Sequence, residues 1–125
     1  WTALHTASVN RELNRVRKLL DGGVSVETRT DDEWSNTLLG EAAVRGHKDI
    51  AQLLLESGAD IEAKDKFGHT ALINASFHGH VGVVEFLLQK GAAVNQTKDN
   101  GCAALHAASA QGHVNIVRLL LKNGA

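Results

Sequence analysis

The sequence repeats itself with a period of 33 residues, and this period restricts the chain to repeat architectures. Gly-His occurs at residues 46–47, 79–80 and 112–113, and Gly-Ala occurs at residues 58–59, 91–92 and 124–125. Leu39, Leu72 and Leu105 keep the same step. A fourth copy stands at the start at a spacing of 35, with its two additional residues in the polar stretch 27–35. Insertions of that kind belong in loops, so the sequence predicts four stacked units.

Each copy contains two short segments with apolar residues at helical spacing, and in the last three copies the Gly-His pair separates them. In the third copy, Leu72 and Ala75 belong to the first segment, and Val83, Val84 and Leu87 to the second. The Gly-Ala pair then follows where a left-handed helix cap is common. By position in the repeat, we expect helices at residues 3–9, 13–20, 38–45, 48–56, 71–78, 81–89, 104–111 and 114–122.

The repeated motif resembles the ankyrin repeat. The resemblance is carried by residues 68–72 (Gly-His-Thr-Ala-Leu), by Gly79-His80 and Leu87-Leu88, and by residues 91–95 (Gly-Ala-Ala-Val-Asn). Residues 2–5 and 103–106 are similar to the family's Thr-Pro-Leu-His signature, although this chain has no proline. The resemblance covers all 125 residues. It implies an all-α fold, an ankyrin-repeat solenoid of helix-turn-helix units joined by short β-hairpin loops. We expect one domain, 1–125, with repeats at about 1–34, 35–67, 68–100 and 101–125.

The two end copies differ from the inner ones. Arg15 and Lys18 stand where the other copies have apolar residues, which is typical of a repeat that has no preceding neighbour. In the last copy Val117, Leu120 and Leu121 have no polar replacement, so we expect their side chains to be left uncovered by any following repeat. With no initiator methionine either, the sequence predicts a longer parent protein, with further repeats or a capping helix after Ala125.

Recognition residues are sought at positions that vary between copies, since the repeated positions maintain the solenoid. In ankyrin-like repeats these are the hairpin tips and the concave side of the first helix. Four of the five aromatic residues, all except Phe86, fall in this set. The predicted partner-binding residues are Trp1, Glu33, Trp34, Asn36, Arg45, Lys66, Phe67, His69, Phe77, His78, Asn100 and Gln111.

These residues favour a scaffold or adaptor module that binds a protein or peptide through its hairpin tips and concave first-helix face. Trp34, Phe67 and Phe77 would be buried by the partner, while Arg45, Lys66 and Glu33 set the register. Trp34 and Phe67 occupy equivalent positions on neighbouring hairpins, so a partial aromatic cage for methyl-lysine, a small ligand or an oligonucleotide base is an alternative. A structural spacer and an engineered binder are further alternatives. Asn95 resembles asparagines that are hydroxylated in this family.

Composition argues against several other classes. Thirteen Lys and Arg against fourteen Asp and Glu give a formal charge of −1, whereas nucleic-acid binders usually carry a basic surplus. No apolar run approaches the roughly 20 residues that span a bilayer. The seven histidines lack cysteine and carboxylate partners at metal spacing, so we expect no metal, no cofactor and no enzyme activity. Cys102 is the only cysteine, which suits an intracellular protein, cytoplasmic or nuclear.

Overall fold

The computed structural model of the chain describes residues 3–95 and 103–125. Each repeat forms two helices, because a residue at positive φ separates its two apolar stripes (Gly46, Gly79 and Gly112, or Arg11 in the first repeat) and a glycine at positive φ follows the second helix. The helices are α1 (Ala3–Val9), α2 (Leu13–Asp21), α3 (Leu38–Arg45), α4 (Lys48–Glu56), α5 (Ala71–His78), α6 (Val81–Gln89), α7 (Ala104–Ala110) and α8 (Val114–Lys122). Expected and observed bounds differ by one residue at the ends of α2 and α7 only.

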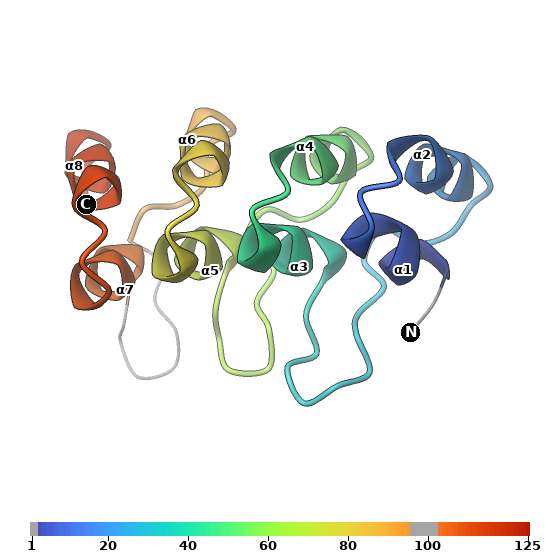
Figure 1. Cartoon of the computed structure of the whole chain (residues 1–125), viewed down its shortest axis with the longest axis horizontal. Helices are drawn as coiled ribbons and strands as arrows, with labels where there is room; N and C mark the ends of the chain where they lie inside the picture. Colours follow the sequence, from blue (N-terminus) through green and yellow to red (C-terminus); the bar gives the residue numbers. More distant parts are fainter. Residues whose placement is uncertain (1–2, 96–102) are drawn as a thin grey trace.

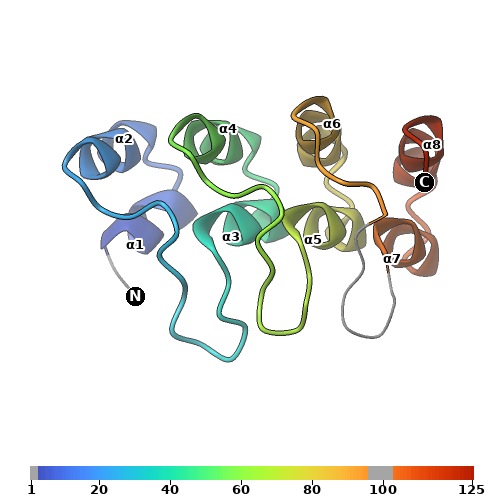
Figure 2. The same cartoon turned by 180° about the vertical axis from the view of Figure 1, so that it is seen from behind.

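The four helix pairs stand in a single row, with α1, α3, α5 and α7 in one layer and α2, α4, α6 and α8 in the other (Figures 1 and 2). The core lies between the layers and between neighbouring pairs. Equivalent leucines of the first helices, Leu4, Leu39 and Leu72, are each at most 2% exposed. Every repeat therefore completes its apolar core with residues of its neighbours, as in other solenoids.

Two described loops extend beyond the first-helix layer, and we call them the first finger (residues 22–37) and the second finger (residues 57–70) (Figure 2). The sequence predicted β-hairpins here. Within residues 3–95 the structure has no strand, and a single antiparallel bridge joins Arg29 to Thr37. The backbone N–H of Thr30 donates to the Asn36 carbonyl and that of Asp65 donates to the His69 carbonyl, both at 2.9 Å. The fingers are thus tight loops closed at the base, without a β-ladder.

The Gly-His pairs connect neighbouring repeats. The Nε2 of His80 donates to the Val44 carbonyl at the end of α3, at 2.9 Å, and the Nε2 of His113 donates to the Phe77 carbonyl, at 3.0 Å. The ring of His80 also fills the space beside Gly46, where an added Cβ would lie 2.5 Å from Nδ1. Each histidine therefore hydrogen-bonds to a carbonyl of the preceding first helix and fixes the spacing of the row.

At the first interface Arg11 occupies the position of this glycine and adds an ion pair, while His47 hydrogen-bonds to the backbone of Ser8. Arg11 adopts φ 58° and its guanidinium contacts the Asp49 carboxylate at 3.0 Å. Burial alone would raise the pKa of Asp49, but the hydrogen bond and positive charge of Arg11 lower it below its usual value. Arg15 and Lys18 are exposed, as predicted for the outer face of α2.

The last repeat corrects one expectation. Leu120 is completely buried, because it belongs to the apolar core that α8 shares with its neighbours. Val117 is half-buried against the same core. Of the three residues expected to lack cover, only Leu121 is largely exposed, at 53%.

Candidate functional site

A groove of about 640 Å³ crosses three repeats on the side of the fingers and first helices. Its walls are the two fingers, and its floor is formed by α3, α5 and α7. The floor residues lie in rows, because equivalent positions of successive helices stand side by side. Glu41, Asn74 and Ala107 form one row. One turn further along the helices, Val44, Phe77 and Ala110 form the next.

Three aromatic side chains at this face are unusually exposed for their size. Trp34 and Phe67 are each 44% exposed, and Phe77 is 46% exposed. Trp34 and Phe77 line the groove, from the first finger and from α5 respectively. Phe67 packs edge-to-face on Trp34, with ring centroids 4.9 Å apart and an interplanar angle of 66°. Large apolar side chains are normally buried, so this exposed set marks a surface suited to contact with another molecule.

Backbone contacts between the fingers hold Trp34 and Phe67 together. The N–H of Lys66 donates to the Trp34 carbonyl at 2.9 Å, so the tips of the two fingers are joined. Arg29 adds a second connection, because its Nη1 donates to the carbonyls of Ser35 and Lys64 at 2.8 and 2.7 Å. The aromatic pair therefore rests on two mutually bonded loops, which restricts its motion.

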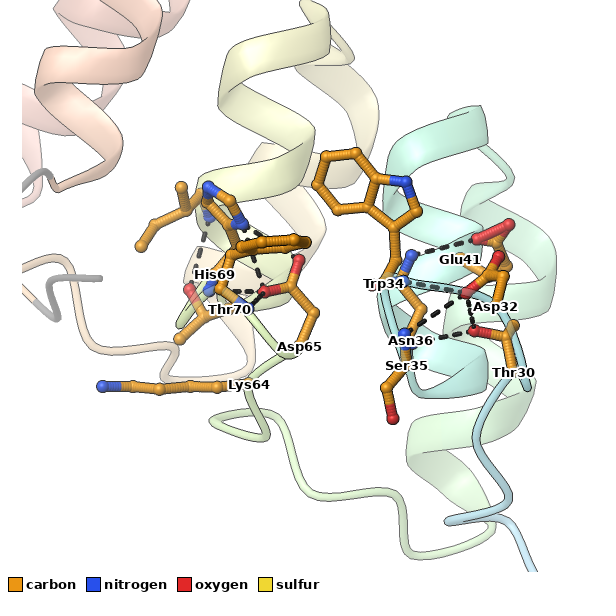
Figure 3. A network of polar contacts seen from close by, with 12 residues as sticks. Thr30, Asp32, Trp34, Ser35, Asn36, Glu41, Lys64, Asp65, His69 and Thr70 are labelled. Atoms are coloured by element: carbon orange, nitrogen blue, oxygen red, sulfur yellow. Dashed lines mark hydrogen bonds and ion pairs between the residues drawn. The ribbon is translucent and has the colours of Figure 1, made fainter. Parts of the chain in front are cut away.

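Each finger is shaped by an aspartate at an equivalent position. Asp32 Oδ1 accepts from the Trp34 N–H at 3.1 Å and from the Thr30 hydroxyl at 2.7 Å. Asp65 Oδ1 accepts from the N–H groups of Phe67 and His69, both at 2.9 Å. The hydrogen bond from Thr30 lowers the pKa of Asp32, which is ionised at neutral pH. Figure 3 shows the Trp34 indole between the Asp32 contacts and the Asp65–His69 pair.

The floor of the groove carries buried polar groups. Glu41 is 8% exposed, and it accepts a hydrogen bond from Asn36 Nδ2 at 3.3 Å and lies 3.6 Å from Arg45 Nε. Asn74 is 7% exposed, and its Nδ2 has no hydrogen-bond partner within the described part of the chain. A buried amide donor without a partner costs free energy, on the order of 1–3 kcal/mol. Asn74 is therefore a polar residue of the groove floor whose donor capacity is not used within the described residues.

Histidines form the third polar element of the groove. His69 Nδ1 lies 3.0 Å from the Asp65 carboxylate, and the pair closes the second finger. The pKa of His78 is lowered by burial, and further by the nearby His80 and His113, so His78 is neutral at pH 7. The described residues hold no group of three or more His, Cys, Asp or Glu side chains placed to bind a metal ion.

The structure brings half of the predicted partner-binding residues into this groove. They are Trp34, Asn36, Arg45, His69, Phe77 and His78. Glu33, Lys66 and Phe67 stand on the finger tips beside it, and Gln111 is exposed just after α7. Trp1 and Asn100 lie outside the described residues. Asn95, the predicted hydroxylation position, is exposed in a turn after α6.

Asn36 differs from the expectation of an exposed contact. It is only 5% exposed, because its N–H donates to the Thr30 hydroxyl and its side-chain amide donates to Glu41. It supports the floor of the groove from beneath, and its position as the residue before the helix cap Thr37 explains the burial.

Sequence reasoning missed the row formed by Glu41, Asn74 and Ala107. These residues are 33 apart and differ in chemistry from copy to copy, which is the signal used for the other recognition positions. They were not predicted as recognition residues because they stand three residues before Val44, Phe77 and Ala110, where the neighbouring apolar residues indicate core positions. Asp32 and Asp65, which shape the fingers, were missed for a different reason, since loop aspartates resemble solvated charges.

The paired helices, the histidine links and the projecting fingers define a solenoid of helical repeats with a groove along its first helices. A family model of ankyrin repeats (three copies) matches residues 1–65 and again residues 62–125. The chain therefore belongs to the ankyrin repeat family, whose repeats generally bind other proteins.

One relative gives a local match. Over 63 residues the chain is 40% identical to the transient receptor potential cation channel subfamily A member 1 homolog of Caenorhabditis elegans. The aligned segment is 50% of this chain but only 5% of that protein. In residues 3–95 and 103–125, no helix is long and apolar enough to cross a membrane.

Proposed function

We propose that this chain is a non-enzymatic protein-binding module whose contact surface is the groove together with the tips of the two fingers. The observation that carries the proposal is the exposure of Trp34 and Phe77, each close to half, at two sides of one groove. Both stand at positions that vary between repeats, so neither is needed to hold the solenoid together. The single cysteine of the chain is in keeping with an intracellular setting.

The physical chemistry of the surface suits a protein partner. Aromatic residues at interfaces are frequent hot spots, each worth about 2 kcal/mol or more when truncated. The surrounding Glu33, Arg45 and Lys66 are exposed and of mixed charge, as is usual at the polar rim of an interface. The groove volume of about 640 Å³ accommodates a short segment of a partner chain, while the finger tips add contact area outside it.

A cation-binding aromatic cage is the second candidate, and the geometry does not favour its simplest form. The rings of Trp34 and Phe67 touch edge-to-face at 4.9 Å, so no space is left between them for a methylated ammonium group. A cation would instead lie on the free face of the Trp34 indole, in the groove that Asp32 also lines. That arrangement fits a basic side chain of a larger partner as well as a modified lysine.

Affinity capture with matched variants tests the proposal. The wild-type chain, the groove variant Trp34→Ala plus Phe77→Ala, and the control Val114→Ala plus Leu121→Ala are immobilised in equal amounts. The control removes two apolar side chains that are 58% and 53% exposed on α8, away from the groove. We expect partners identified by quantitative mass spectrometry to be retained by wild type and control and lost at least tenfold on the groove variant. Equal retention by all three proteins would overturn the proposal.

A further inference from the structure

The two ends of the groove differ in chemistry, and this difference specifies the partner more closely. We propose that the groove holds an extended peptide segment with a basic side chain on Trp34 and an aliphatic side chain beside Phe77. The proposal rests on the proposed function, because it assumes that the groove is the contact surface. It adds the class of partner sequence. It also adds the course of the segment, which runs along the row of repeats between the first finger and α7.

The end of the groove at the first finger is acidic. Asp32, Glu41 and Asp65 line the groove, and Asp31 and Glu33 are exposed on the same finger as Trp34. Arg45 is the one Lys or Arg in the lining formed by the described residues, and it already pairs with Glu41. Lys66 and Arg29 lie close to Trp34 on the fingers, outside the groove lining. An exposed indole in a groove lined by three carboxylates attracts a lysine ammonium or arginine guanidinium through both cation–π and charge interactions. Phosphate-bearing ligands are disfavoured at this end for the same reason.

The opposite end has small apolar side chains in its floor, and His78 and His106 also line it. Ala107 and Ala110 of α7 stand where α5 has Asn74 and Phe77, so the floor is lower on the α7 side of Phe77. The ring of Phe77 forms one wall of this hollow. Ala107 is 6% exposed and its methyl group faces the groove lining. A branched aliphatic side chain such as leucine, isoleucine or valine would bury its surface against Phe77 and these two methyl groups.

A peptide backbone crossing from one end to the other passes α5, where Asn74 lies. Asn74 lines the groove at this point, and its Nδ2 lacks a partner within the described residues, so Asn74 is the polar side chain of α5 that the crossing segment meets. Neighbouring helices pack about 8–10 Å apart, and an extended chain rises about 3.3 Å per residue. Two helix steps from α3 to α7 therefore correspond to a basic and an aliphatic residue separated by about five to six positions.

Selection from a library of displayed linear peptides of twelve random residues tests this inference with the full chain. We expect enriched peptides to share a lysine or arginine and an aliphatic residue about five to six positions apart. Asp32→Asn plus Glu33→Gln should weaken their binding about fivefold, since two partly exposed charges are lost while the introduced amide oxygen still accepts the hydrogen bonds of the finger. Ala110→Phe should weaken it about tenfold by filling the hollow.

Matched controls separate these effects from general changes of charge or shape. Glu85→Gln removes an exposed carboxylate from α6, and Val114→Phe enlarges an exposed side chain on α8. Both controls should leave the affinity unchanged. Binding in the groove is judged by loss of binding on Trp34→Ala plus Phe77→Ala. If peptides that bind there lack the basic residue, or tolerate Asp32→Asn plus Glu33→Gln, the inference is overturned and the proposed function is left intact. If no enriched peptide is sensitive to the groove variant, both fall.

Discussion

Gly79 ends α5 in the left-handed region, at φ 77°, and the ring of His113 from the next repeat lies beside it. A Cβ at this position would approach His113 Cε1 to 2.7 Å. The glycine thus has two functions, since it ends its own helix and leaves room for the histidine that binds the Phe77 carbonyl. Phe77 itself lines the groove, so this contact helps to position a groove residue.

The substitution Gly79→Ala tests this double function. We expect it to lower the free energy of unfolding by about 2 kcal/mol, roughly half from left-handed strain and half from loss of the His113 hydrogen bond as the ring moves away. Gly58→Ala is the matched control, because Gly58 has φ 94° and nothing lies within 4 Å of an added Cβ. Urea unfolding should give a control loss of about 1 kcal/mol. Equal losses at the two glycines would show that the histidine contact contributes nothing.

At the scale of the helix, the start of the first helix varies between repeats. Thr37 Oγ1 accepts from the Gly40 N–H at 3.0 Å, and Thr70 Oγ1 accepts from the Ile73 N–H at 3.3 Å. Ala103 occupies the same position before α7 but has no hydroxyl group. Instead, its N–H donates to His106 Nδ1 at 3.2 Å. The helix that forms one end of the groove floor therefore begins without the side-chain cap that its two neighbours have.

Ala103→Thr should restore this cap. We expect the free energy of unfolding to rise by about 1 kcal/mol, which is the usual contribution of a threonine N-cap. Ala103→Val has the same shape without the hydroxyl group, so it measures any effect of side-chain size alone. Thermal and urea unfolding of both variants provide the comparison. Equal stability of the threonine and valine variants would refute the capping argument.

The helices were predictable from the sequence because their boundaries depend on local, repeated signals. In the last three copies the Gly-His and Gly-Ala pairs mark where the two helices end, so errors reached only one residue, at α2 and α7. The fingers were less predictable. A β-ladder was expected, but Asp32 and Asp65 bind the N–H groups of their own loops and close tight turns instead. Such side-chain contacts have no period and leave no strong pattern in a sequence.

Over the whole molecule, the groove exists only because several repeats are held in register. Its lining comes from two fingers and three first helices, and the histidine links and finger-to-finger hydrogen bonds fix their relative positions. The sequence predicted which repeats would be neighbours, and so it predicted that Trp34 and Phe67 would stand on adjacent loops. It did not predict their edge-to-face contact, which depends on the Lys66–Trp34 backbone hydrogen bond. Nor did it predict the burial of Asn36.

The most direct test of the account is hydrogen–deuterium exchange of the chain with and without a partner obtained by affinity capture. We expect the partner to slow exchange in the two fingers and in α3, α5 and α7, which line the groove, and to leave α2, α4 and α8 unchanged. Protection confined to the second helices of the repeats, with the fingers and first helices unaffected, would contradict the assignment of the groove as the binding surface.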